Sequence, residues 1–118
     1  MIYELREYTA VPGRLPALVE RFNAATCRIF RKHGMELVFL SRTEVGDDSK
    51  NEIVYVLRFE SYDDLQSKWA AFFADPEWKT VAARSEEDGP LVARVRRRLL
   101  TTADFPGVDP ASAGRPRP

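Results

Sequence analysis

Apolar and charged residues alternate along the first segment of the chain, residues 3–9. An alternation with a period of two is typical of a β-strand whose two faces meet different surroundings. Three later segments also have the composition of strands and are bounded by turn-forming residues, at about 36–45, 53–60 and 92–102. The turn-rich loop 46–51 is short enough to predict that the strands on either side of it form an antiparallel hairpin.

The segments between these strands have apolar residues at helical spacing. From Leu15 to Gly34 the apolar residues recur at intervals of three, four and seven, which predicts one helix with a buried stripe and a glycine at its end. Ser61 and Asp64 form a capping pair before a second helix, and Asp75 followed by proline restarts a short further helix. The predicted order, βαββαβ, indicates an α+β, ferredoxin-like subunit in which the helices cover one face of a four-stranded antiparallel sheet.

The composition changes near the end of the chain. Residues 1–103 have the mixture of apolar and charged residues of one globular domain. Residues 104–118 contain four prolines and two glycines with little apolar content, which predicts a disordered tail.

Composition and charge exclude several classes of function. Lys plus Arg equals Asp plus Glu, at 18 each, so we expect no nucleic-acid partner. No apolar run reaches membrane-spanning length, and we expect no membrane partner and a cytoplasmic location. Cys27 is the single cysteine, and neither metal-ligand spacing nor a glycine-rich phosphate loop is present. We therefore predict no metal and no cofactor.

The alternation also divides the strand residues between the two faces of the predicted sheet. We expect the more apolar set to face the helices: Tyr3, Leu5, Leu37, Phe39, Ile53, Tyr55, Leu57, Phe59, Val95 and Leu99. The second set would lie on the open face: Glu4, Arg6, Tyr8, Val38, Leu40, Arg42, Val54, Val56, Arg58, Arg94, Arg96 and Arg98. A face of such mixed polarity is typical of a pocket or a subunit interface.

Five short motifs, in order along the chain, resemble those of the NIPSNAP family: Ile2-Tyr3-Glu4-Leu5-Arg6-Glu7-Tyr8-Thr9 with Pro12-Gly13, His33-Gly34-Met35, Glu44-Val45-Gly46, Asn51-Glu52 and Asp75-Pro76-Glu77-Trp78. The resemblance covers residues 1 to about 105. It implies the fold of the dimeric α/β-barrel proteins, in which two subunits place their open sheet faces together around a cavity. A homodimer is therefore the expected assembly.

The arginines of the predicted open face suggest a ligand. A guanidinium group binds planar anions through two parallel hydrogen bonds, so we expect a cavity for a small anionic organic molecule. The ligand-binding candidates are Glu4, Arg42, Arg96 and Arg98. If the protein is an enzyme, the catalytic candidates are Arg6 and Arg58, which would hold the substrate anion, and Tyr8, which would transfer a proton. The expected reaction is then that of a cofactor-independent oxygenase, isomerase or cyclase.

Two alternatives compete with this hypothesis. The arginines could instead form salt bridges inside the barrel of a non-catalytic structural or interaction module. A haem-handling protein is the other alternative, with the single histidine, His33, as the natural ligand, although its position predicts packing at a helix C-terminus. The aromatic residues Trp69, Phe72, Phe73 and Trp78 have the spacing of a buried helical face, and we expect them in the core.

Overall fold

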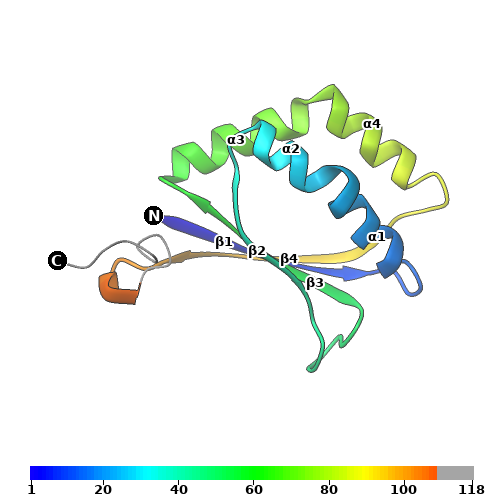
Figure 1. Ribbon diagram of the computed structural model, residues 1–118, viewed down its shortest axis with the longest axis horizontal. Helices are drawn as coiled ribbons and strands as arrows, with labels where there is room; N and C mark the ends of the chain where they lie inside the picture. The colour runs from blue at the N-terminus through cyan, green and yellow to red at the C-terminus, as the bar shows by residue number, and fades with distance from the viewer. Residues whose placement is uncertain (109–118) are drawn as a thin grey trace.

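A computed structural model describes residues 1–108 of the chain and confirms the predicted α+β fold (Figure 1). The elements are β1 (Ile2–Ala10), α1 (Leu15–Arg21), a π-helical segment η1 (Phe22–Thr26), α2 (Cys27–Lys32), β2 (Glu36–Arg42), β3 (Glu52–Phe59), α3 (Tyr62–Ala74), α4 (Pro76–Ser85), β4 (Val92–Thr101) and the 3₁₀ turn η2 (Pro106–Val108). The predicted tail, 104–118, lies for the most part outside the described residues. No helix within residues 1–108 is long and apolar enough to cross a bilayer.

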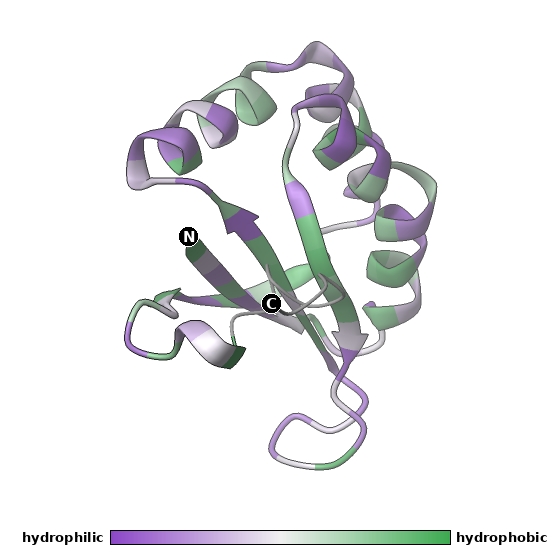
Figure 2. Cartoon of the chain, turned by 60° about the vertical axis from the view of Figure 1, so that its left-hand side comes forward, coloured by the Kyte–Doolittle hydropathy of each residue, from purple (hydrophilic) through white to green (hydrophobic). Residues whose placement is uncertain are grey.

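The four strands form one sheet in the order β2-β3-β1-β4, and every neighbouring pair is antiparallel. All the long helices lie over the same face of this sheet (Figure 1). The predicted hairpin is confirmed by the pairing of β2 with β3. The loop that joins them extends away from the sheet and is mostly hydrophilic (Figure 2).

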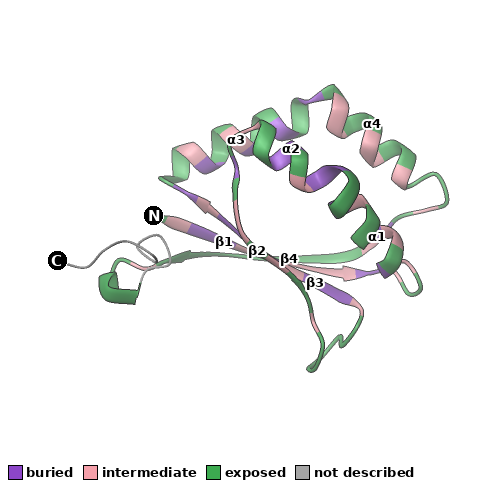
Figure 3. Cartoon of the chain, viewed as in Figure 1, coloured by how far each residue is buried: buried purple, intermediate pink, exposed green. Residues whose placement is uncertain are grey.

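The hydrophobic core lies between the helices and the sheet. Phe22, Ile29 and Phe30 pack from the first helical segment against Tyr55 and other side chains of β3, and all of these are buried. Burial is greatest in β3 and in the inner sides of the helices, whereas β4 is exposed along most of its length (Figure 3). Removal of these apolar side chains from water is the main contribution to the stability of such a fold.

The predicted aromatic core of α3 and α4 is confirmed except at one position. Trp69 and Phe72 are buried and Trp78 is half-buried, but 51% of Phe73 is exposed. The ring of Phe73 stacks on that of Trp69, with centroids 5.2 Å apart and planes at 18°. Phe73 therefore forms a wall at the edge of the core instead of filling it.

The predicted helix ends are confirmed. Ser61 accepts a hydrogen bond from the backbone N–H of Asp64, and Asp75 accepts one from Glu77 at 2.8 Å at the start of α4. Gly34 has a φ of +68°, the left-handed conformation that ends the first helical segment. The sequence pattern did not predict η1, which inserts a π-helical turn into the middle of that segment.

The predicted orientation of the first strand is wrong. Glu4 pairs with Leu57, Arg6 with Tyr55 and Tyr8 with Ile53, and paired residues share a face. The three polar residues of β1 therefore lie toward the helices, and Tyr3 and Leu5 lie on the open face. The reason is that these polar groups are hydrogen-bonded to one another and to α3 inside the domain, so alternation of polarity does not separate the faces.

The second strand is predicted wrongly from its middle onward. Its register shifts between Leu37 and Phe39, so one extra residue of β2 opposes β3. Leu37 keeps its predicted place, whereas Phe39 turns to the open face and Leu40 and Arg42 turn to the helix side. The registers of β3 and β4 confirm the predicted faces of those strands, including the open-face position of Arg94, Arg96 and Arg98.

Candidate functional site

A buried carboxylate is the centre of the polar cluster on β1. Glu4 has no exposed surface, and its two oxygens accept three hydrogen bonds from side chains. The donors are the indole Nε1 of Trp69 at 2.6 Å, Nε of Arg97 at 2.5 Å and Nη1 of Arg6 at 3.1 Å. Because a buried carboxylate is tolerated only when it is paired and hydrogen-bonded, Glu4 fixes the positions of both arginines.

Arg6 links this carboxylate to two tyrosines. Its Nε and Nη2 atoms donate to the Tyr8 hydroxyl oxygen at 3.2 and 3.0 Å, and its guanidinium carbon lies 4.6 Å from the centre of the Trp69 ring. Burial alone would lower the pKa of Arg6, but the neighbouring oxygens of Tyr55, Tyr8 and Glu4 outweigh it and raise that pKa. Arg6 is therefore a cation with most of its donors engaged.

The two tyrosines end the cluster. The hydroxyl oxygens of Tyr8 and Tyr55 are 2.7 Å apart, and their rings meet edge to face. Burial raises the pKa of Tyr55 well above its usual range, although the Arg6 guanidinium acts in the opposite direction. Tyr55 is therefore a neutral phenol at physiological pH.

An open cleft of about 540 Å³ adjoins this cluster, between α3 and the strands β1 and β4. Its lining is Arg6, Tyr62, Leu65, Gln66, Trp69, Phe73 and Arg97, and we call it the arginine cleft. The side chain of Arg97 is 44% exposed here. Within residues 1–108 its two terminal nitrogens have no hydrogen-bond partner, since only Nε is bonded to Glu4. A guanidinium beside a stacked aromatic pair is suited to a planar anion.

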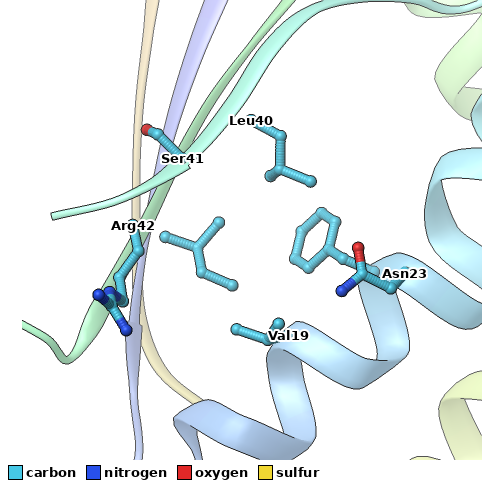
Figure 4. Close-up of a pocket in the computed structure, with 7 residues that line it drawn as sticks. Val19, Asn23, Leu40, Ser41 and Arg42 are labelled. Carbon is cyan, nitrogen blue, oxygen red and sulfur yellow. The ribbon is translucent and has the colours of Figure 1, made fainter.

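A second hollow of about 210 Å³ lies toward the opposite edge of the sheet, between α1, η1 and β2 (Figure 4). Val19 and Leu40 extend into it from the helix and the strand, and Asn23 lies at its rim (Figure 4). Arg42 also lines this hollow, but Nη2 is bonded to Glu44 at 2.7 Å. The hollow is apolar and offers no comparable guanidinium for an anion.

The structure brings some of the site residues predicted from the sequence together and places the others elsewhere. Glu4, Arg6 and Tyr8 are brought together, on the opposite face from the one predicted. Arg58 lies on the open face, where its Nε donates to Glu36 at 2.8 Å. The remaining candidates lie apart from the cluster: Arg42 at the hollow just described, and Arg96 and Arg98 exposed on the open face.

Sequence reasoning missed Arg97, Trp69 and Tyr55 as members of the site. Arg97 lies between two open-face arginines, and the alternation of β4 places it on the helix side, opposite Arg6. That signal was present in the sequence, but it could be recognised only once the orientation of β1 was known. Trp69 and Tyr55 look like ordinary core residues because each is mostly apolar and reaches the cluster with a single polar atom.

His33 lies away from the arginine cleft. Its Nε2 atom is 2.7 Å from Oδ2 of Asp75, which also receives a hydrogen bond from Lys32. The hydrogen bonds from Lys32, from His33 and from the backbone of Glu77 hold the pKa of Asp75 well below its usual range. Burial raises the pKa of the Cys27 thiol, which is consistent with an unreactive side chain. No group of three metal-ligating side chains is found in the described part of the chain.

Comparison with known proteins identifies relatives of this chain. Residues 3–106 match the family model described as NIPSNAP. A NIPSNAP family protein with unknown function from Agrobacterium tumefaciens is 30% identical, with 85% of this chain and 86% of that chain covered and a TM-score of 0.73. An uncharacterized NIPSNAP-like domain protein from Burkholderia xenovorans is 25% identical, with 88% and 86% covered and a TM-score of 0.75.

A more distant structure shares the fold alone. A putative antibiotic biosynthesis monooxygenase from Nitrosomonas europaea is 12% identical, with 86% of this chain and 97% of that chain covered and a TM-score of 0.59. A search of curated proteins gave no match.

Proposed function

Since the chain belongs to the NIPSNAP family, whose fold leaves one sheet face open for pairing, we propose that it forms a homodimer and binds a small organic anion in the arginine cleft of each subunit. The ligand class is the one that the sequence suggested, a small organic anion, but the proposed site differs from the expected one. The ligand would lie between the helices and the sheet, not in the barrel interior between two sheets.

The observation that carries this proposal is the position of Arg97. The buried carboxylate of Glu4 accepts a hydrogen bond from Nε of Arg97. This bond fixes the orientation of the guanidinium group and leaves its two terminal nitrogens available to a ligand. These two nitrogens of Arg97 have no hydrogen-bond partner within residues 1–108, and Arg97 lines a cleft whose wall is the stacked pair Trp69 and Phe73. A planar carboxylate can accept two hydrogen bonds there while its body packs against Trp69 and Phe73.

The open sheet face supports the dimer. Phe39 and Leu100 are 49% and 41% exposed on or beside it, although both are large apolar side chains. Arg58 and Glu36 form an ion pair on the same face, near its edge. A mixed face of this kind, with apolar side chains that one subunit leaves in contact with water, suits pairing with a second copy.

Catalysis is the second candidate function, and the Arg6–Tyr8–Tyr55 chain favours it. Arg6 is held by two hydrogen bonds to the Tyr8 oxygen and lines the arginine cleft, and the charge of a cation fixed in this way stabilises negative charge that develops on a bound enolate or phenolate. A cofactor-independent isomerase, cyclase or oxygenase would use such an arrangement. Arg58 has no part in it because it lies on the opposite face of the sheet.

Native mass spectrometry of protein purified gently from its own cells tests the proposal. We expect a dimer that carries a reproducible adduct of small mass, and negative-ion analysis of the released molecule should identify an organic acid. A monomer would overturn the dimer. A dimer that repeatedly binds no organic acid, alone or on addition of planar carboxylates, would favour the non-catalytic structural module. Visible absorbance of the same sample tests the haem alternative.

A further inference from the structure

Arg21 is a buried cation that is incompletely satisfied. Only 8% of its side chain is exposed, at the C-terminal end of α1. Nη1 donates to Ser85 at 3.2 Å, and the nearest carboxylate oxygen, on Glu86, is 3.7 Å away. Nε is fully buried and has no hydrogen-bond partner among the described residues. Burial lowers the pKa of Arg21, and a buried donor without an acceptor is rare because it is costly.

Arg21 lines a small, partly enclosed cavity of about 40 Å³. The other polar lining residues are Tyr8 and Thr26, and aromatic rings, among them Trp69, Phe73 and Trp78, form most of the rest. The guanidinium carbon of Arg21 lies 5.3 Å from the centre of the Trp78 ring. The cavity is therefore an aromatic enclosure with one cationic wall, and it is large enough for a water molecule or a carboxylate group.

The backbone around Arg21 is also unusual. The π-helical segment begins at the next residue, Phe22, and ends at Thr26, whose hydroxyl donates to the carbonyl oxygen of Arg21 at 3.3 Å. Single π-helical turns within α-helices are uncommon and occur frequently at functional sites. Here the turn places Arg21, Phe22 and Thr26 at the same cavity.

We propose that this cavity is a second anion subsite, in which one oxygen of a carboxylate or enolate group accepts a hydrogen bond from the guanidinium group of Arg21. The inference rests on the proposed function, because Trp69 and Phe73 line both this cavity and the arginine cleft. A ligand whose body packs against these rings could place one anionic end at Arg97 and the other at Arg21. The site would then select planar organic acids with two anionic ends.

The charges of the two regions agree with this assignment. Arg6, Arg21 and Arg97 form ion pairs with only two carboxylates within residues 1–108, those of Glu4 and Glu86. One guanidinium charge is left uncompensated, which favours an anion, and the second anionic end of the ligand would take the place of Glu86 at Arg21. Glu86 is 44% exposed, so its pairing with Arg21 is also the weakest of the three.

Formate is a probe for the subsite alone, because it has a single carboxylate and no body to occupy the cleft. The measurement is the ¹H–¹⁵N signal of each arginine Nε–Hε group during a formate titration against chloride at constant ionic strength, with Arg21→Lys to assign the Arg21 signal. We expect a saturable shift at Arg21. Arg14 is the matched control, because its Nε is also buried without a partner among the described residues, but it lines none of the cavities described above. No shift at Arg21, or an equal shift at Arg14, would overturn the subsite.

A second measurement compares two probes of the same body, 2-naphthoate and naphthalene-2,6-dicarboxylate, by calorimetry. The wild-type protein should bind the dicarboxylate about tenfold more tightly, the effect of one additional charged hydrogen bond. Arg21→Met should remove this preference without weakening 2-naphthoate, whereas Arg14→Met should keep it. Equal affinity of the wild-type protein for both probes would overturn the inference. If neither probe binds, the proposed function fails and the formate titration alone decides on the subsite.

Discussion

The indole Nε1 of Trp69 lies 2.6 Å from Oε1 of Glu4, inside the domain, and joins α3 to β1. This contact explains how a strand with a buried charged residue near its start can face a hydrophobic core. The carboxylate is fixed from the helix by Trp69 and from the sheet by Arg6 and Arg97, and none of its surface is exposed. The polar cluster and the arginine cleft are both built around it.

Substitution of Trp69 by phenylalanine should therefore destabilise the protein. The change removes a hydrogen bond to a buried carboxylate, and we expect the free energy of unfolding to fall by about 2 kcal/mol, measured with urea. Trp78→Phe is the control, because Trp78 is only half-buried and its indole has no hydrogen-bond partner in the described chain. A loss at Trp69 no larger than that at Trp78 would contradict the role given to this contact.

Asp75 should contribute to stability in a pH-dependent manner. Its pKa in the folded protein is held well below the value of about 3.9 expected for an unfolded chain. A group with a depressed folded pKa stabilises the protein above its unfolded pKa, and this contribution is lost as the pH falls toward the folded value. Asp75→Asn keeps a residue that can cap α4 but removes the charge.

The wild-type protein should consequently be more stable than the Asp75→Asn variant at pH 7. The difference should narrow once the pH falls below about 4. Urea unfolding of both proteins between pH 7 and pH 2 measures it. A difference that stays constant over this range would show that the ionised carboxylate is not responsible.

Phe39→Asp should dissociate the proposed dimer. The substitution places a charge at an exposed aromatic position on the open face of the sheet, where burial of an unpaired carboxylate in an interface is costly. Light scattering after size-exclusion chromatography should give the mass of one subunit, with the circular dichroism spectrum unchanged. The control is Val45→Asp, because Val45 is 90% exposed in the loop between β2 and β3. A variant at Phe39 that stays dimeric would place the interface elsewhere.

Local signals in the sequence were sufficient to predict the elements and their order. Ser61, Asp75 and Gly34 act where they were expected to act, because helix caps and left-handed glycines depend on a few neighbouring residues. The faces of β3 were also predictable, since its alternation of apolar residues is strong and its side chains fill the core.

The orientation of β1 and the second half of β2 depends on contacts that are distant in sequence. Glu4 is buried because Trp69 and Arg97, which come much later in the chain, supply its hydrogen bonds. The bulge between Leu37 and Phe39 leaves no clear mark in composition, and it reverses every later side chain of that strand. Glu4, Arg6 and Tyr8 were therefore predicted correctly as members of one cluster, but on the wrong side of the sheet.

The central claim is that the ligand binds on the helix side of the sheet, and neighbouring residues of β4 test it most directly. Arg97 faces the arginine cleft, whereas Arg98 pairs with Leu5 on the open face. The measurement is the dissociation constant of 2-naphthoate for Arg97→Met and Arg98→Met, with the dimer verified in each. We predict that Arg97→Met weakens binding at least about tenfold, as expected for loss of charged hydrogen bonds, and that Arg98→Met leaves it unchanged. The reverse result would place the ligand between the two sheets and contradict the account.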